Sequence, residues 1–346
     1  MPKAESSVFA RWRASGARLI QRHPVARYLT LKVGRAVFVI WATFTATFVL
    51  LYVFPADPVD LLVDPAAVGQ VRGELREQLA ATYGFDKPPL EQYLDRLGHA
   101  LTGDFGNSVT SGKPVGHAIA ETLPHTLVLA ALALGAALLI AFALAVGATA
   151  TRRPWLRNFL TSLPSAAVSI PSFMVAILLL QVFAFTFGWF PAFGDQGWRT
   201  MVLPVATLAL PVSGPIAQLL IRSFEAELGA SYIATSRAKG ATRTRILTGD
   251  VFRNASLPAL TIAGIVFGNL IAGSVITETV FSRQGVGRLT QTAISSLDVP
   301  LVQGVVVLVA AAFAAINLAV DLLYPLLDPR IRVSLAQGSA PAGASA

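Results

Sequence analysis

The sequence predicts an all-α membrane protein with six transmembrane helices and both termini in the cytoplasm. Its residues are 54% hydrophobic and 13% charged, whereas an average soluble domain has roughly 25% charged residues. Several apolar runs reach the roughly 20 residues that a spanning helix needs. Basic residues gather in alternate connecting segments, as they do in cytoplasmic loops. The net charge of +8 therefore indicates membrane topology rather than binding to nucleic acid.

Six apolar runs are long enough to span. The predicted spans cover residues 36–54, 126–150, 160–190, 201–221, 257–278 and 301–323. The third is too long for one straight helix, and Pro164 and Pro171 predict a kinked or broken entry. The fourth contains Pro204, Pro211 and Pro215. We expect it to face protein rather than lipid, because there the carbonyls freed by proline find partners.

The segments between the spans alternate in charge. Residues 1–35 hold eight basic residues and one acid, residues 151–158 hold three arginines, and residues 222–256 hold six basic residues and three acids. Residues 55–121 instead hold five basic residues and ten acids. Since basic loops remain in the cytoplasm, this alternation predicts both cytoplasmic termini and an extracytoplasmic loop at 55–121.

A single membrane domain is expected, flanked by two extensions. The six spans occupy residues 36–327, after a basic cytoplasmic extension at 1–35 and before a cytoplasmic tail at 328–346. The loop 55–121 is too long to be a simple connection. Its stretches Val71–Thr82 and Leu90–Leu101 are helix-like, so we expect either a small cap over the outer mouth or a docking surface.

The motifs of common enzyme classes are missing from the sequence. It has no cysteine and four histidines, which argues against a cysteine–metal site or a His-rich metal centre. No phosphate-binding G-x-x-x-x-G-K-[ST] loop, H-E-x-x-H or G-x-S-x-G occurs. We therefore expect neither an enzyme nor a bound cofactor or metal.

Uncharged polar residues inside the spans are candidates for contacts between helices or along a transport pathway. Four residues form this set: Gln181, Gln218, Asn269 and Asn317. Most such residues hydrogen-bond to neighbouring helices, and one or two of them are expected to contact substrate.

Acidic residues at the ends of two spans are functional candidates. Asp321 lies at the cytoplasmic end of the sixth span, where pairing with Arg330 is the simpler interpretation. Glu278 ends the fifth span at the outer side, and it either caps the next turn or lines a pathway. The sequence shows no acid near the middle of a span, which argues against a proton-coupled secondary carrier.

A basic segment between the fourth and fifth spans predicts a helix–turn–helix on the cytoplasmic face. Tyr232–Lys239 tolerates a helix, and Gly240 permits the left-handed residue that often ends one. Thr242 offers an oxygen to cap a second helix, whose apolar face would run from Ile246 to Phe252. The segment is either an ordinary basic loop held by anionic lipid or an element that inserts into a partner's groove.

This segment resembles the cytoplasmic coupling segment, or EAA loop, of the inner-membrane permease subunits of ABC importers for dipeptides, oligopeptides and nickel. Ala234, Thr235 and Ser236 stand where the general motif has Glu-Ala-Ala, six residues before its glycine, which is Gly240 here. The missing glutamate resembles the peptide–nickel branch of the family. By this resemblance the residues that couple to an ATPase are Ala234, Thr235, Ser236, Ala238, Lys239, Gly240, Ala241, Arg245, Ile246 and Leu247.

The resemblance covers about residues 30 to 332. It rests on ordered segments before the second span, around the third span and at both sides of the sixth: YGFDKPPLEQYLDRLGHALTGDFGNSV, LPHTLVLA, SIPSFMVAILLLQVFA, GWFPAFG, ETVFSRQGVGRL and NLAVDLLYPLLDPRIR. Gln284 stands where a proline is usual in the family, which predicts a looser turn before the last span.

The resemblance implies the permease architecture of a type I ABC importer in the bacterial inner membrane. It implies as partners a second homologous permease, two cytoplasmic ATPases, an extracytoplasmic substrate-binding protein and membrane lipid, with no nucleic acid. ATP binding would close the ATPases, move the coupling helices and open the pathway outward. Peptides are the expected substrate, with nickel or another small solute as an alternative within the family. A stand-alone secondary carrier is the alternative of a different class.

Overall fold

The computed structural model describes residues 24–54 and 88–327, and these residues are almost entirely helical. The elements are α2 (Pro24–Phe48), η1 (Val49–Val53), α4 (Pro89–Leu101), α5 (Val115–Ala150), α6 (Pro154–Ser169), α7 (Ser172–Leu179), η2 (Leu180–Thr186), α8 (Arg199–Leu228), α9 (Ser231–Ala238), α10 (Arg243–Arg245), η3 (Ile246–Val251), α11 (Phe252–Val280), α12 (Val286–Ser295) and α13 (Val299–Leu327), where η marks π-helical stretches.

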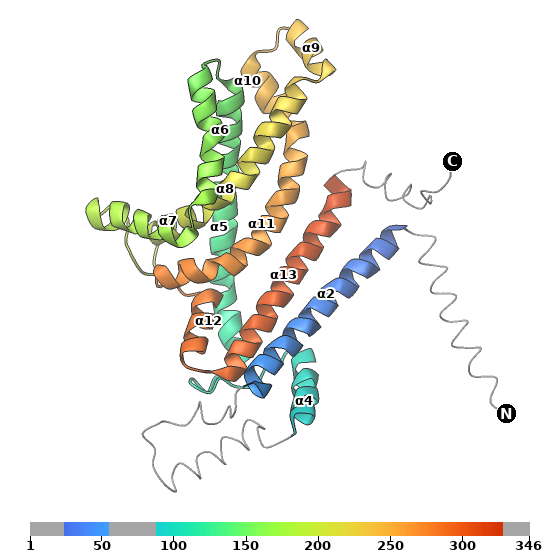
Figure 1. Cartoon of the computed structure of the whole chain (residues 1–346), viewed down its shortest axis with the longest axis vertical. Helices are drawn as coiled ribbons and strands as arrows, with labels where there is room; N and C mark the ends of the chain where they lie inside the picture. Colours follow the sequence, from blue (N-terminus) through green and yellow to red (C-terminus); the bar gives the residue numbers. More distant parts are fainter. Residues whose placement is uncertain (1–23, 55–87, 328–346) are drawn as a thin grey trace, which may run out of the picture.

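Five of the described helical segments are long and apolar enough to cross a membrane, and a bent helix pair is the sixth candidate. The five lie within α2–η1, α5, α8, α11 and α13, and the bent pair is α6 with α7–η2. Figure 1 shows α5, α6, α8 and α11 grouped together, with α13 and α2 beside them. The predicted all-α membrane fold is therefore confirmed, while the side of the membrane on which the termini lie stays a prediction.

Several helices extend beyond the predicted spans. Helix α5 begins at Val115 rather than 126 and carries Pro124 inside it, so the predicted loop 55–121 ends earlier than expected. Helix α2 begins at Pro24, within the predicted extension at 1–35. Hydropathy marks only the part of a helix that suits lipid, whereas the backbone hydrogen bonds continue the helix past that part.

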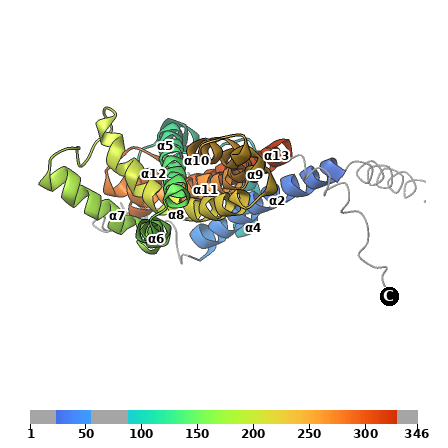
Figure 2. The ribbon, with the colours of Figure 1, turned by 90° about the horizontal axis from the view of Figure 1, so that it is seen from above.

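The third predicted span is broken, and its second half turns sideways. Helix α6 ends at Ser169, Ile170 is extended, and α7 starts after Pro171. Proline lacks a backbone N–H and pushes the preceding residue out of the helical region, which explains the break. The two halves meet at 104°. Seen from above, α7 projects to the side of the α5–α8–α11 group opposite to α2 (Figure 2).

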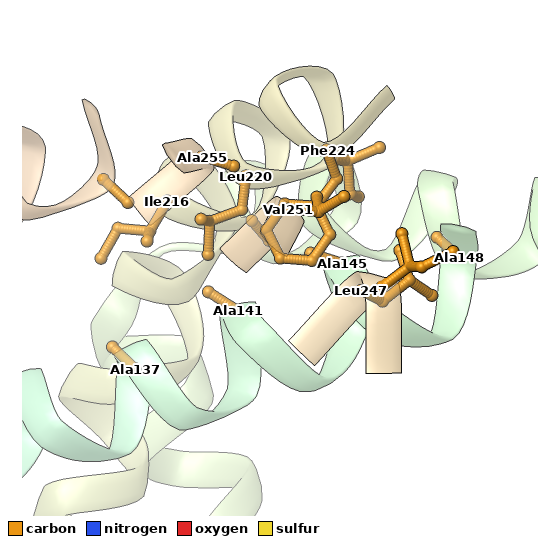
Figure 3. Close-up of a cluster of buried hydrophobic side chains, with 14 of the residues drawn as sticks. Ala137, Ala141, Ala145, Ala148, Ile216, Leu220, Phe224, Leu247, Val251 and Ala255 are labelled. Atoms are coloured by element: carbon orange, nitrogen blue, oxygen red, sulfur yellow. The ribbon is translucent and has the colours of Figure 1, made fainter. Parts of the chain in front are cut away.

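A stripe of alanines on α5 forms the centre of the largest apolar core. The stripe is Ala137, Ala141, Ala145 and Ala148, and every member is buried. Small side chains let helix backbones approach closely in a membrane bundle, so Phe224 and other large residues of α8 fit against this stripe (Figure 3). Helix α8 remains unbroken through its three prolines, of which Pro204 is buried and Pro215 exposed.

Helix α2 packs along α13, and α4 is hydrogen-bonded to α2. Phe48 and Tyr52 contact Val299 at the start of α13. The Tyr93 hydroxyl of α4 lies 3.0 Å from the indole nitrogen of Trp41 and 2.9 Å from Thr45 Oγ1. The predicted helix at 90–101 is thus confirmed, while the one at 71–82 lies outside the described residues.

Candidate functional site

The predicted turn after α9 is confirmed in detail. Gly240 has φ of +81°, a value that costs glycine little because it has no Cβ. Its N–H donates to Arg237 O at 2.9 Å, and the N–H of Ala241 donates to Ser236 O at 3.1 Å. This pair of bonds is the Schellman arrangement that satisfies carbonyls at a helix end, so the turn is a defined structure rather than a loose loop.

The helix after the turn is continuous with the fifth span. Thr242 Oγ1 accepts a bond from Arg245 N at 3.4 Å, which confirms the predicted cap. Residues Arg245, Ile246 and Phe252 all keep right-handed helical dihedrals at the element boundaries. The expected separate amphipathic helix is therefore the first part of one long helical segment that ends at Val280.

The apolar face of this segment packs inside the chain. Ile246, Leu247 and Val251 are buried against the alanine stripe of α5 and against Phe224 of α8 (Figure 3). Ile233 of α9 belongs to the same cluster. We expected this face to meet a partner, but the structure uses it to fix the segment to the bundle, so Ile246 and Leu247 do not reach the surface.

The remaining predicted coupling residues form an accessible surface at the end of the molecule marked by α9 in Figure 1. Ser236 and Ala241 are half-buried. The exposed members are Ala234, Thr235, Ala238, Lys239, Gly240 and Arg245. We call these six residues the α9 surface.

Polar bonds connect α9 to α8 and to the start of α11. Ser236 Oγ donates to Asp250 Oδ2 at 2.8 Å. The Tyr232 hydroxyl donates to Glu227 Oε2 and accepts a bond from Asn254 Nδ2 at 3.0 Å. Burial, followed by the bond to Glu227, raises the pKa of the Tyr232 phenol. The phenol therefore keeps its proton at neutral pH and can act as this donor.

Arg243 connects the same segment to α5. Its guanidinium donates to the carbonyl of Thr149 at 2.5 Å, in the last turn of α5. Carbonyls there lack partners within the helix, and a cation at this end is favourable. Nearby, Arg157 of α6 forms an ion pair with Glu225 of α8 at 2.6 Å. Polar contacts therefore connect α9 and the segment after it to the ends of α5, α8 and α11.

At the opposite end of α11, Glu278 caps α12. Its Oε2 accepts the N–H of Gly287 at 2.7 Å and that of Arg288 at 3.3 Å, and its Oε1 accepts the hydroxyl of Thr126 at 2.7 Å. Thr126 Oγ1 in turn accepts the N–H of Val286 at 2.9 Å. Of the two interpretations of Glu278, the structure supports the cap. We call this group of residues the outer junction, after the side of the membrane that the sequence predicts for it.

The turn between α11 and α12 is fastened rather than loose. The N–H of Gln284, which a proline would lack, donates to Asp195 Oδ2 at 2.9 Å. Arg283 lies 3.3 Å from the other oxygen of Asp195 and donates to Gly194 O at 3.1 Å. The contact between Arg283 and Asp195 Oδ1 is an ion pair without hydrogen-bond geometry. The loop before α8 and the turn before α12 therefore hold each other.

The polar residues predicted within spans have separate roles. Gln218 Nε2 donates to Ser165 Oγ at 3.3 Å and links α8 to α6, whereas Asn317 Nδ2 donates to Phe313 O of its own helix at 2.9 Å. Gln181 and Asn269 are exposed. Asp321 lies in α13, but its side chain is outside the described part of the chain. The structure does not gather these residues into one site.

More than half of the sequence, towards its C-terminus, matches the model of a known protein family. Residues 137–333 match the family described as the binding-protein-dependent transport system inner membrane component. The chain belongs to this family. It is thus a multi-pass permease subunit of an inner-membrane transport system.

Full-length relatives agree with this assignment. The permease is 35% identical over 285 residues to the glutathione transport system permease protein GsiC of Salmonella typhimurium, which covers 82% of this chain and 92% of that protein. It is 36% identical over 309 residues to a putative peptide transport system permease protein of Brucella abortus, with coverage of 87% and 97%.

A solved structure shares the fold. A chain of the MetNI methionine ABC transporter, in an inward-facing conformation, aligns with a TM-score of 0.52 at 18% identity, over 61% of the permease and 96% of that chain. At this identity the likeness supports the fold alone.

Sequence reasoning missed the buried polar residues that connect the loops at the end of the permease away from α9. Asp298 is fully buried and accepts bonds from Ser108 Oγ at 2.5 Å, Thr110 Oγ1 at 2.9 Å and Leu301 N at 3.2 Å. It thereby caps α13 and holds the loop before α5. The one signal in the sequence was an aspartate directly before an apolar run, which is a common helix cap.

Proposed function

We propose that this permease forms half of the translocation pathway of an ATP-driven importer, together with a second homologous permease. Two cytoplasmic ATPases would supply the energy, and an extracytoplasmic binding protein would deliver the substrate. Family membership supports the transport role. The observation that carries the coupling role is the α9 surface, which is exposed while its helix is fixed to three spans.

The α9 surface suits a partner that transmits force. A helix held only by its own backbone would bend when pushed, whereas α9 is anchored by buried Ile233 and by bonds from Ser236 and Tyr232. Its exposed residues are mostly small, so another protein can approach the backbone closely. We infer that an ATPase binds here and that its closure moves the inner ends of α5, α8 and α11.

Peptides are the substrate class that we propose. The relatives named above are glutathione and putative peptide permeases, and glutathione is itself a small peptide. Selectivity in such systems depends largely on the binding protein, so nickel or another small solute is the alternative that a substrate assay must exclude.

Reconstitution tests the proposed assembly. The chain, co-expressed with a homologous permease and the ABC ATPases of the same organism, should co-purify with them. In vesicles the assembly should take up labelled di- or oligopeptide when ATP and the binding protein are supplied. Uptake by this chain alone without ATP would instead establish a secondary carrier, and ATP-driven uptake of nickel but not peptide would correct the substrate.

Substitution of Ala234 by arginine tests the coupling surface. The side chain is exposed, so the variant should fold and insert normally while the added bulk obstructs ATPase docking. We expect at least a tenfold loss of ATP-driven uptake and loss of the ATPase from the purified complex. Gln291→Arg, on the exposed side of α12 at the opposite end, is the matched control and should transport normally. Normal uptake by Ala234→Arg would exclude the α9 surface as the docking site.

A further inference from the structure

The broken third span ends in a sideways arm with one apolar face uncovered. This arm consists of α7 and η2, residues 172–186. Ala176 and Leu180 pack against Leu203 of α8 and Phe281 at the end of α11. On the other side Ile177 is 56% exposed and Phe185 is 60% exposed. A helix lying on a water-exposed surface would present a polar face there, whereas the exposed side chains of this arm are apolar apart from Gln181 and Thr186.

Aromatic rings follow the arm directly. Trp189 is 54% exposed and Trp198 is 73% exposed, and Phe187 stacks on Trp189 with ring centroids 4.8 Å apart. Polar Asp195 and Gln196 lie between the two tryptophans. This order, from apolar through aromatic to polar, is the composition found where the hydrocarbon region of a membrane meets water.

Helix lengths give the distance along the bundle between the aromatic loop, residues 187–198, and the arginines that follow α5. Arg283 bonds Gly194 O of the loop, and Val286, three residues further along, bonds Thr126 of α5. From Thr126 to Thr149, helix α5 rises by roughly 35 Å. The hydrocarbon core of a bilayer is about 30 Å thick. The aromatic loop therefore lies about one membrane thickness from the arginines that follow α5.

We propose that the arm lies along the outer boundary of the membrane, with its uncovered face in lipid and with Trp189 and Trp198 among the headgroups. Helix α6 also exposes apolar side chains, such as Phe159 and Val168, and these would face lipid as well. It follows that the third crossing is made by α6 with the extended Ile170 and Pro171 after it, and that α7 and η2 do not continue it. It also follows that α12 and the first turns of α5, residues 115–125, stand outside the hydrocarbon. This inference does not depend on the proposed substrate.

Spin labels on the arm test this placement. The chain has no cysteine, so single cysteines can be introduced by Ile177→Cys and Phe185→Cys. The full-length protein is labelled and reconstituted in phosphatidylcholine–phosphatidylglycerol vesicles. Depth is then measured from the ratio of collisions with oxygen and with a polar nickel chelate. A helix that crosses the membrane would separate these two positions by roughly 12 Å in depth.

The arm as proposed gives a different result. Because it meets α6 at 104°, the two labels should lie within roughly 4 Å of each other in depth. Both should be shallower than a label at Leu139→Cys, an exposed position near the middle of α5, and Trp198→Cys should be the shallowest of all. Phe173→Cys, also on the uncovered face, replaces either arm variant that fails to insert.

Two outcomes would overturn the proposal. A depth difference near 12 Å between Ile177→Cys and Phe185→Cys would mean that the arm crosses the membrane. Low collision rates with both reagents at both positions, beside a high oxygen rate at Leu139→Cys, would mean that protein covers the face. In that case a second permease rather than lipid would be its occupant.

Discussion

At the residue scale, the outer junction depends on the first N–H groups of α12, which have no partner within that helix. Glu278 accepts two of them, and Thr126 accepts a third while donating its own hydroxyl to Glu278. The junction therefore joins α5, α11 and α12 through one carboxylate and one hydroxyl, both buried.

Glu278→Gln should weaken this junction. The carboxylate accepts at both oxygens, whereas an amide would turn a donor toward the Thr126 hydroxyl or toward the N–H groups of α12. We expect a loss of about 2–3 kcal/mol of stability, the range for a charged hydrogen-bonding group replaced inside a protein. Thermal unfolding in detergent, followed by circular dichroism, measures it. The exposed Glu121→Gln is the control and should unfold like the parent; equal midpoints for both variants would contradict this account.

Gln284→Pro should loosen the turn before α12. Proline removes the N–H that Asp195 accepts at 2.9 Å, and we expect a cost of about 1–2 kcal/mol. Gln284→Ala retains the N–H and should be nearly neutral. Protease cleavage within residues 188–198 should therefore accelerate in the proline variant but not in the alanine variant. The same cleavage rate in both would show that the side chain, not the N–H, matters.

At the element scale, close helix contacts occur where side chains are small or absent. A Cβ placed on Gly214 of α8 would lie 2.6 Å from the carbonyl oxygen of Pro164 and 2.6 Å from Val168 Cγ2. The first atom belongs to the backbone of α6, which cannot move like a side chain. The crossing of α6 and α8 thus requires a glycine, for reasons of space rather than of backbone dihedrals.

Gly214→Ala should consequently separate α6 from α8 at a cost of about 1–3 kcal/mol, the usual range for overpacking. Gly135→Ala on α5 is the matched control, because a Cβ there meets nothing within 4 Å. The control should be neutral or slightly stabilising, since alanine favours a helix over glycine. Unfolding temperatures of the two variants in the same detergent provide the comparison, and a Gly214→Ala protein as stable as the parent would refute the close contact.

The segment from α9 to η3 has one surface that is packed against the bundle and another that is exposed. The Schellman turn at Gly240 and the cap at Thr242 shape the segment locally. Burial of Ile233, Leu247 and Val251 then fixes it to α5 and α8. What remains exposed is the α9 surface, so stability and the proposed docking depend on different residues of one short segment.

At the scale of the whole molecule, basic residues outnumber acids at one end of the bundle. Arg152, Arg153, Arg237 and Arg245 lie in the segments next to the ends of α5, α8 and α11 that adjoin α9. The outer junction and Asp298 lie in the segments at the other end of these helices. The positive-inside rule therefore predicts that α9 is cytoplasmic and that α12 is extracytoplasmic.

Single introduced cysteines can test this orientation. The chain has no cysteine of its own, so only the introduced residue reacts with a thiol reagent. An impermeant maleimide should label Gln291→Cys on α12 from outside intact cells. Arg237→Cys on α9 should react only after the membrane is permeabilised, because it faces the cytoplasm. Both positions are exposed, so access rather than burial decides the result. The reverse pattern would place both termini outside and would rule out a cytoplasmic ATPase at α9.

Much of this architecture could be predicted from local sequence. Apolar runs located the spans because hydropathy is a property of consecutive residues, and Gly240 and Thr242 predicted the turn because helix ends depend on neighbouring backbone groups. The same reasoning failed for Ile246 and Leu247. An apolar face indicates that a helix packs against something, but it does not indicate whether that surface belongs to the same chain.

The sequence by itself determined that this protein is a helical membrane permease with a basic, glycine-broken segment between its fourth and fifth spans. Only the tertiary structure decided which polar residues meet and which faces remain free. Thr149 and Arg243 are 94 residues apart, and Ser108 and Asp298 are 190 apart, so no local pattern specifies these pairs. The sideways arm has the same origin: Pro171 predicts a break, but packing against α8 and α11 sets its direction.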